Sequence, residues 1–460
     1  MSGRKYTLSL LLLDTFTLVA VFNVLAWIRG VTPYGTLITW PLTVPWILAV
    51  FALYLIDGYK ARTDMLSVDY TSLHSIAMGS ALLTTLLITF VVFPGRYGLQ
   101  GSRAVIAIGM LALLIIALGY RRFIYQGRTK SERDRIIVFL GDRPSAEQFR
   151  TECARQALAH TVVYSIIDDS SAASFHFPES QTLRTSEEVI NSIHSGELQV
   201  EAIVLKESAR TLSPTLAQSL VQLYFHGTPT YTLELFNQVY WRKIPLYRLN
   251  QIWLFQEGFQ IAREPVFERI KRVADITLAS LGLILSSPII AMAAMAIRLE
   301  DGGPVFFRQN RVGKNRTLFQ VIKLRTMRAA RTTSVGDERY TQLADPRITK
   351  VGRFLRSSRI DEFPQLWNVL VGEMSLIGPR AEWDRLVEDY EKQIPCYHFR
   401  HLVRPGITGW AQVNYPYGAN LEDTQHKLEY DLYYIRHFSF FLDASIVLKT
   451  IHTMIFGRGR

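Results

Sequence analysis

Four blocks of apolar residues fill most of the first quarter of the chain. They cover residues 8–28, 37–56, 73–93 and 104–120, and the last block is the shortest. A helix needs about 20 mainly apolar residues to cross the hydrocarbon core of a bilayer. The sequence therefore predicts a multi-domain membrane protein in which residues 1–125 form four transmembrane helices.

Lysine and arginine cluster at three ends of these blocks. The residues are Arg4 and Lys5 before the first block, Lys60 and Arg62 after the second, and Arg121, Arg122, Arg128 and Lys130 after the fourth. The predicted outer loops hold fewer cations, namely Arg29, Arg96 and Arg103. Because positive charge favours the cytoplasmic side, the four crossings should start and end in the cytoplasm.

Three residues in the first two blocks refine this picture. Asp14 lies within the first block near its cytoplasmic end, and we expect it to be paired or to reach towards water. Pro41 and Pro45 lie at the start of the second block. Because proline disrupts a helix interior, the second helix should start late or be kinked.

The formal net charge of the 460 residues is +11. This excess suits anionic lipid headgroups or phosphorylated substrates. We expect no nucleic-acid partner, because the sequence has no nucleic-acid-binding motif and is rich in apolar blocks. Cys153 and Cys396 are far apart, which fits reduced thiols and indicates no metal cluster.

Residues 131–250 are typical of a separate domain in which strands and helices alternate. The segments RIIVFLGD, TVVYSIID and EAIVLKES have the pattern of buried strands. This alternation predicts a parallel, Rossmann-like α/β sheet. The turn after the first strand, GDRPSAE, lacks the GxGxxG pattern that cradles a pyrophosphate, so we favour a structural or regulatory role over cofactor binding. Asp168 and Asp169, at a strand end, are interpreted as part of a turn.

Residues 240–268 form a linker with aromatic and basic character. Its notable side chains are Trp241, Arg242, Lys243, Tyr247 and Trp253. Aromatic rings and the stems of lysine and arginine are favoured at the headgroup level of a membrane. We therefore expect this linker to lie there.

A fifth apolar block covers residues 276–299 and is long enough to cross a membrane. Both of its flanks are basic, and a crossing helix cannot keep both ends in the cytoplasm. Ser287 and Pro288 lie near its midpoint, where proline removes a backbone hydrogen bond that a serine hydroxyl can replace. We expect a re-entrant helix–break–helix over 268–299, with a fifth transmembrane helix as the alternative.

Two adjacent acids, Asp361 and Glu362, precede an apolar stretch that Pro364 begins and Gly372 ends. Proline suits the first turn of a helix, whose positive end favours ionised carboxylates. Such carboxylates can attack an electrophile or hold Mg²⁺, although an ordinary acidic helix start has the same pattern. The surrounding cations suit a phosphate-bearing substrate. They include Arg308, Arg311, Lys323, Arg325, Arg380 and Arg404.

Several motifs in the last 195 or so residues resemble the bacterial sugar transferase family. They are FFRQNRVGKN, FQVIKLRTM, DEFPQLWNVLVGEMSLIGPR and RPGITGWAQVNY, in this order. The family contains polyprenyl-phosphate hexose-1-phosphate transferases, which are monotopic-type phosphoglycosyl transferases. The tail from residue 414 resembles the subgroup associated with exopolysaccharide and exosortase systems. The resemblance implies an α/β catalytic domain over 264–460 with a re-entrant membrane helix.

The resemblance also implies a reaction and roles for the matching residues. Asp361 would attack the sugar-linked phosphate of a UDP-sugar and release UMP, while Glu362 would help to hold Mg²⁺. Polyprenyl (undecaprenyl) phosphate would then take the sugar phosphate, the first step of exopolysaccharide or O-antigen assembly. Glucose or galactose is the family-typical sugar. Candidate substrate-binding residues are Lys323, Arg325, Arg380, Arg308, Arg311, Arg404 and Asp431.

Other expectations concern the context of this activity. Ala381 follows Arg380 where the family usually has proline, which should loosen the loop. The resemblance implies the bacterial inner (cytoplasmic) membrane, with the soluble domains in the cytoplasm, and a homodimer would be compatible with it. The alternative function is a non-catalytic scaffold for polysaccharide assembly. A scaffold should have lost its acids or cations, whereas Asp361, Glu362, Lys323 and Arg380 are all present.

Overall fold

A computed structural model describes residues 3–60, 63, 65–92, 103–129, 136–156, 158, 160–166, 186–206, 212–246, 265–328, 347–415 and 420–456. The chain divides into two compact units, Met1–Thr232 and Leu233–Arg460. The second unit carries the acidic pair and most of the candidate residues. Each unit is described by itself.

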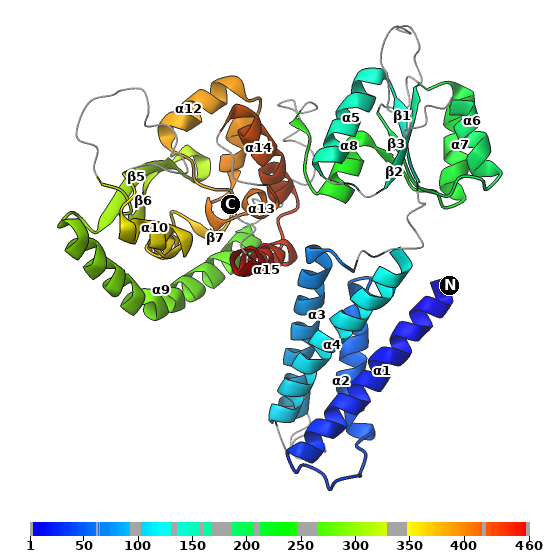
Figure 1. The fold of residues 1–460 in the computed structure, drawn as a ribbon, viewed down its shortest axis with the longest axis horizontal. Coiled ribbons are helices and arrows are strands. Elements are labelled where there is room, and N and C mark those ends of the chain that lie inside the picture. The colour runs from blue at the N-terminus through cyan, green and yellow to red at the C-terminus, as the bar shows by residue number, and fades with distance from the viewer. Residues whose placement is uncertain are drawn as a thin grey trace. The chain divides into compact units, whose positions relative to one another are not determined.

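The first unit begins with a helical bundle (Figure 1). Its helices are α1 (Gly3–Ile28), α2 (Thr43–Leu55), α3 (Val68–Leu87) and α4 (Arg103–Thr129). Three segments of the bundle are long and apolar enough to cross a membrane, namely Lys5–Ile28, Tyr70–Val91 and Arg103–Gly127. The predicted four-helix N-terminal region is thus present as helices.

The second helix starts late, as the prolines predict. A 3-10 helix, Trp40–Leu42, precedes α2, which begins at Thr43. Its 13 residues span about 20 Å at 1.5 Å per residue, less than the hydrocarbon core of a typical bilayer. The predicted second crossing is therefore shorter than the apolar block that suggested it.

A buried ion pair joins α1 to α4. The Arg121 guanidinium donates two hydrogen bonds to the Asp14 carboxylate, Nη1 to Oδ1 at 2.7 Å and Nη2 to Oδ2 at 2.6 Å. The hydroxyls of Tyr59 and Tyr120 donate to the same carboxylate. Asp14 is 4 % exposed and Arg121 is completely buried. The expectation that Asp14 is paired is confirmed.

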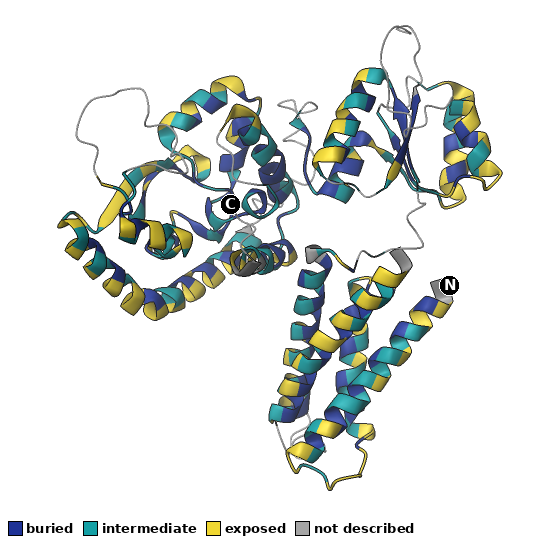
Figure 2. Ribbon diagram, viewed as in Figure 1, coloured by how far each residue is buried: buried dark blue, intermediate teal, exposed yellow. Residues whose placement is uncertain are grey.

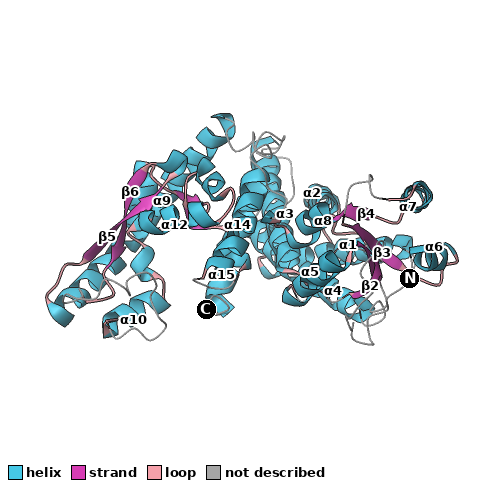
Figure 3. Ribbon diagram, turned by 90° about the horizontal axis from the view of Figure 1, so that it is seen from above, coloured by secondary structure: helices cyan, strands magenta, loops and turns pink. Residues whose placement is uncertain are grey.

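The first unit continues with a parallel sheet, as predicted. Its strands are β1 (Ile136–Gly141), β2 (Thr161–Ile166), β3 (Val200–Leu205) and β4 (Thr230–Thr232), in the order β2-β1-β3-β4. Its helices are α5 (Arg143–Arg155), α6 (Ser186–His194) and α7 (Pro214–Phe225). Helix α5 covers one face, and α6 and α7 cover the other (Figures 1 and 3).

Successive side chains of β1 point to opposite faces of the sheet. Val138 packs with Val189 of α6 and Leu220 of α7, whereas the ring of Phe139 stacks on Phe149 of α5 at 4.9 Å between centroids. This alternation is what a strand covered on both faces requires.

In the turn after β1, the side chain of Asp142 makes two interactions within the domain. The Asp142 carboxylate accepts a hydrogen bond from the backbone N–H of Ser145 at 3.0 Å and forms an ion pair with Lys206, just after β3. An incoming phosphate would therefore meet a negative charge at the N-terminus of α5. The structural or regulatory role expected for this domain stays a prediction, and Asp168 and Asp169 lie outside the described residues.

The segment after β4 belongs to the second unit. It comprises α8 (Leu233–Phe236), a π-helical turn (Asn237–Trp241) and an irregular stretch to Leu246. Lys243 is buried and donates to Glu429 at 3.0 Å, and Trp241 is 9 % exposed. Both residues are part of the second unit and are buried within it. They therefore do not lie at the headgroup level of the membrane, where the linker was expected. Tyr247 and Trp253 lie outside the described residues.

The rest of the second unit is mostly helical. Its elements are α9 (Pro265–Asp301), β5 (Phe306–Val312), β6 (Leu318–Leu324), α10 (Lys350–Ser357), α11 (Gln365–Val371), β7 (Ser375–Ile377), α12 (Asp384–Gln393), β8 (Gly406–Thr408), α13 (Trp410–Asn414), α14 (Leu421–Arg436) and α15 (Phe440–Phe456). Strands β5 and β6 form an antiparallel hairpin, and β7 pairs with β8 in parallel. A core around Trp410, Tyr397 and Leu432 holds these elements together.

Helix α9 is continuous over 37 residues, so the predicted break is absent. Pro288 lies inside it, and the Ser287 hydroxyl donates to the carbonyl of Ile284 at 2.8 Å. This carbonyl would otherwise bond the N–H that proline lacks, so the serine does replace the missing donor, and the helix bends without unwinding (Figure 1).

An apolar face of α9 is left uncovered within the described residues (Figure 2). Leu285, Met292 and Leu299 are 67 %, 65 % and 81 % exposed. By length and composition α9 is a fourth helix that could cross a membrane, over Val266–Asp301. An exposed apolar surface of this extent needs a lipid or protein partner.

We predict that Asp14→Asn destabilises the bundle by about 3 to 5 kcal/mol, because Arg121 would keep its charge without a counter-ion. Thermal unfolding of the detergent-solubilised chain measures this loss. The control is Asp57→Asn, whose partner Lys60 is 70 % exposed, and which should leave the unfolding temperature unchanged. Equal unfolding temperatures for both variants would contradict the importance of the buried pair.

Candidate active site

The acidic pair lies in a short 3-10 helix, Ile360–Glu362, just ahead of α11. Pro364 directly precedes α11, and Gly372 ends it with a φ of 97°, a conformation that glycine adopts without strain. The predicted helix limits are therefore confirmed. They fix both carboxylates at one end of a rigid element.

Glu362 is held by two cations from different parts of the chain. Lys323 of β6 donates to its Oε1 at 2.9 Å, and Nη2 of Arg380 lies 3.7 Å from the same atom. Burial raises the pKa of Glu362, but the charges of Lys323 and Arg380 outweigh it and lower that pKa to about 2. Glu362 is therefore ionised at neutral pH.

Asp361 has the opposite electrostatic environment. It is 9 % exposed, and its Oδ1 has no hydrogen-bond partner within the described part of the chain. Burial, followed by the neighbouring negative charge of Glu362, raises the pKa of Asp361. The helix N-terminus was expected to favour ionisation of both acids, but at Asp361 the loss of hydration has the larger effect.

Asn368 links the strand that carries Lys323 to the helix that follows the acids. Its Nδ2 donates to the Gln320 carbonyl at 2.7 Å, and its Oδ1 accepts from the Ile322 N–H at 3.1 Å. It is 1 % exposed. The sequence reasoning missed this residue, although an amide in the middle of a mainly apolar helix is a signal, since a buried polar group needs partners.

Two guanidinium groups hold the loop that carries Arg380. Arg311 donates to the Ala381 carbonyl at 2.9 Å, and Arg400 donates to the Arg380 carbonyl at 2.9 Å. Ala381 is buried. The absence of the family's proline was expected to loosen this loop, but these bonds fix its backbone instead.

The other predicted residues lie apart from the acidic pair or behind it. Arg308 lies opposite Ile322 in the hairpin, so it points away from the face that bears Lys323. Arg325 pairs with Asp301 and bonds the Pro304 carbonyl. Asp431 is 2 % exposed, so it lies too deep for the predicted contact with substrate. The structure thus groups Asp361, Glu362, Lys323 and Arg380, with Arg311 supporting them.

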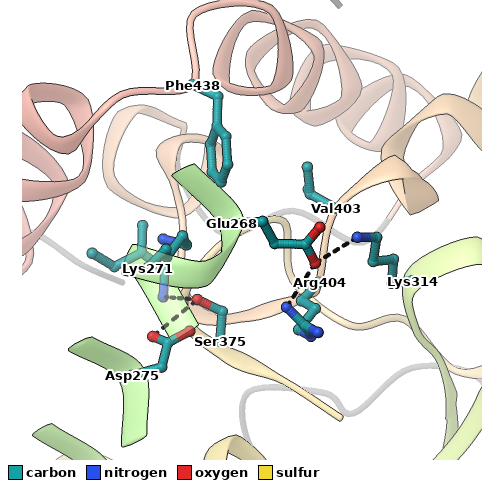
Figure 4. A pocket seen from close by; sticks show the side chains of 9 residues that line it. Glu268, Lys271, Asp275, Lys314, Ser375, Val403, Arg404 and Phe438 are labelled. Carbon is teal, nitrogen blue, oxygen red and sulfur yellow. Dashed lines mark hydrogen bonds and ion pairs between the residues drawn. The ribbon is translucent and has the colours of Figure 1, made fainter. Parts of the chain in front are cut away.

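Arg404 lies in a separate small cavity of about 20 Å³ (Figure 4). There the Glu268 carboxylate accepts from Arg404 at 2.9 Å and from Lys314 at 2.6 Å. Nearby, Ser375 donates to Asp275 at 3.1 Å. Lys314 and Arg404 are compensated by Glu268 of α9, and Lys271 of α9 is compensated by Asp443 of α15, so these ion pairs fix the start of α9 to the domain.

The acidic pair fits a magnesium ion of the kind that accompanies phosphate substrates. Mg²⁺ in such sites is held by one or two carboxylates together with substrate phosphates. Asp361 has a buried oxygen with no partner among the described residues, and Glu362 is ionised beside it. A dedicated protein cage is not seen, because the described residues contain no cluster of three or more metal-ligating side chains.

Several relatives share much of this chain. A UDP-N-acetylgalactosamine-undecaprenyl-phosphate N-acetylgalactosaminephosphotransferase of Aeromonas hydrophila is 38 % identical over 264 residues, which cover 57 % of this chain and 61 % of the relative. An undecaprenyl-phosphate glucose phosphotransferase of Komagataeibacter xylinus is 31 % identical over 368 residues, covering 76 % of this chain and 64 % of the relative. The chain thus spans a little over three fifths of the length of each.

A third relative is covered more fully. A UDP-glucose:undecaprenyl-phosphate glucose-1-phosphate transferase of Caulobacter vibrioides is 42 % identical over 208 residues, which cover 45 % of this chain and 77 % of the relative. The family model described as bacterial sugar transferase matches residues 266–457, which include α9 and every residue of the site. The chain therefore belongs to the bacterial sugar transferase family.

Proposed function

We propose that the protein transfers a hexose-1-phosphate from a UDP-sugar to undecaprenyl phosphate, as the first step of exopolysaccharide or O-antigen assembly. One observation carries the proposal most directly. Asp361, a buried carboxylate with an oxygen that has no partner among the described residues, lies next to an ionised Glu362 that two cations hold. The names of the relatives from Aeromonas and Caulobacter describe the same class of reaction.

In the proposed first step Asp361 is the nucleophile. Its free Oδ1 attacks the sugar-linked phosphorus of the UDP-sugar, and the bond from this phosphorus to the bridging oxygen breaks. UMP leaves with the bonding electrons, and an aspartyl-phosphosugar remains. Phosphoryl transfer depends mainly on positioning and charge neutralisation, which Lys323 and Arg380 would supply.

In the second step the lipid releases the enzyme. An oxygen of undecaprenyl phosphate attacks the same phosphorus, and the bond to Asp361 breaks. The products are undecaprenyl-diphospho-sugar and the free carboxylate. The relatives' names give glucose and N-acetylgalactosamine, whereas the family-typical expectation was glucose or galactose, so the sugar is left open.

Glu362 would hold Mg²⁺ together with the donor phosphates, which leaves Oδ1 of Asp361 for the attack. When bound, Mg²⁺ would neutralise charge on the diphosphate. The chain itself keeps Glu362 ionised through Lys323 and Arg380, so that this carboxylate is a ligand at neutral pH.

The proposed location is the inner membrane of a bacterium, with the second unit in the cytoplasm. Its support is the set of apolar helices, the basic helix ends and the uncovered apolar face of α9. We propose that α9 is re-entrant. The curvature of α9 in Figure 1, together with Pro288 inside the helix and the Ser287 hydroxyl on the freed carbonyl, supports a helix that enters and leaves one leaflet.

Asp361→Asn should abolish UMP release from a UDP-sugar and label transfer to extracted lipid, by at least about a thousand-fold, because the attacking group is lost. Both are measured on the full-length chain in membranes. The control Asp389→Asn makes the same chemical change on α12 and should keep the wild-type rates. Near wild-type turnover in Asp361→Asn would disprove the nucleophile, and an inactive wild-type chain would favour the scaffold.

Removal of Mg²⁺ should stop UMP release, because Lys323 and Arg380 alone leave the diphosphate charge incompletely neutralised. The measurement is the rate after treatment with EDTA and after restoring Mg²⁺. Restoration with Mg²⁺ but not with Na⁺ at equal ionic strength is the expected result. Full activity in excess EDTA would argue against the metal.

Both ends of α9 should face the same side of the membrane. Single cysteines at Arg269 and Leu299, in a chain without Cys153 and Cys396, are treated with a membrane-impermeant maleimide from either side. Both should react from the cytoplasmic side, whereas a cysteine at Tyr34 in the loop after α1 should react from the other side. Labelling of the two α9 positions from opposite sides would show that the helix crosses.

A further inference from the structure

We propose that Arg400 and Asp431 are positioning residues that hold Arg380 against Glu362 for the transfer reaction. This inference rests on the proposed function. The two residues touch neither Asp361 nor Glu362 by any hydrogen bond seen among the described residues. They act through the backbone of the loop at Arg380.

The first link of this arrangement is a buried ion pair. Arg400 is 6 % exposed and Asp431 is 2 % exposed, and Nη2 of Arg400 lies 2.9 Å from Oδ2 of Asp431. The Arg400 guanidinium also donates to the Tyr397 hydroxyl. Removing one charge from such a pair leaves the other buried without compensation. Asp431 is therefore what allows Arg400 to stay charged in the interior.

The second link joins this pair to the site. The same Nη2 of Arg400 donates to the carbonyl oxygen of Arg380 at 2.9 Å. This bond fixes the peptide from which the Arg380 side chain extends, and Nη2 of that side chain lies 3.7 Å from the Glu362 carboxylate. A shift of this backbone therefore moves the guanidinium relative to the acidic pair.

The other side of the loop is already fixed, which makes Arg400 the complementary restraint. The Gly406 N–H donates to the Pro379 carbonyl at 2.9 Å, and Arg311 holds the Ala381 carbonyl. Three consecutive carbonyls, of residues 379 to 381, thus accept bonds from three different elements. Arg400 is the restraint on the residue that faces Glu362.

The charges around Asp431 support a structural electrostatic role. Burial raises the pKa of Asp431 to about 6, while Arg400 lowers it, Glu382 raises it and Lys427 lowers it. Its Oδ1 is buried without a hydrogen-bond partner in the described part of the chain. Asp431 is thus a deeply buried carboxylate, and its bond to Arg400 gives it a structural role.

The test compares Asp431→Asn and Arg400→Lys with Glu429→Gln. Glu429 is a matched control because it lies on α14 two positions before Asp431, is buried, and pairs with a buried cation, Lys243, at 3.0 Å. All three variants are made in the full-length chain. Arg400→Lys keeps the charge but cannot reproduce the guanidinium's bonds to both partners, so it remains informative if Asp431→Asn accumulates poorly.

The first readout is amide hydrogen exchange over residues 378–383, which does not depend on activity. We expect faster exchange there in Asp431→Asn and Arg400→Lys than in Glu429→Gln, since only the first two release the loop. Equal exchange in all three variants would overturn the proposal.

The second readout is kinetic. Asp431→Asn and Arg400→Lys should lower label transfer by up to about 100-fold, the effect of a misplaced catalytic group, and Glu429→Gln should not. In an Arg380→Ala background Asp431→Asn should cause no further loss, because both changes affect one guanidinium. Additive losses would overturn the proposal. A wild-type chain without transfer activity would instead refute the proposed function, and the exchange data alone would then decide this inference.

Discussion

The second unit depends on one partly buried ion pair, that between Lys323 and Glu362. These residues come from a strand and a 3-10 helix that are 39 positions apart, and their bond of 2.9 Å joins the hairpin to the start of α11. Burying two charges is costly unless each finds its partner in good geometry. Asn368 provides this geometry by joining β6 to α11, and Arg380 adds a second positive charge. The pair therefore fixes the acidic segment relative to the β5–β6 hairpin.

The same burial divides the two adjacent acids into different roles. Lys323 and Arg380 lower the pKa of Glu362, which is therefore ionised. Burial and the negative charge of Glu362 raise the pKa of Asp361. The pKa values of two carboxylates with similar intrinsic acidity thus shift in opposite directions because the cations lie beside only one of them. An acid with an oxygen that has no hydrogen-bond partner among the described residues, beside a carboxylate that two cations hold, is the arrangement that the proposed phosphoryl transfer requires.

The sequence predicted the elements better than the contacts between them. Hydrophobic patterns identified the parallel sheet and the apolar helices, and Pro41 and Pro45 identified the late start of α2, because these signals are local. The sequence did not predict that the segment after β4 packs within the second unit, because the bond between Lys243 and Glu429 joins residues 186 positions apart. The break expected at Pro288 was absent because Ser287 supplies the missing bond within the helix. Arg325 and Arg404 could not be separated from Lys323 and Arg380, because composition does not reveal their partners, Asp301 and Glu268.

The bond between α9 and α11 has a mechanical consequence. Arg272 of α9 donates to the carbonyls of Val369 and Leu370 at the end of α11, about 10 Å along that helix from the acidic pair. If α9 rests in one leaflet, its depth therefore sets the height of the reacting phosphorus above the lipid surface. Bilayer thickness varies among membranes by a few ångströms. It would then affect the distance between the bound donor and the lipid phosphate.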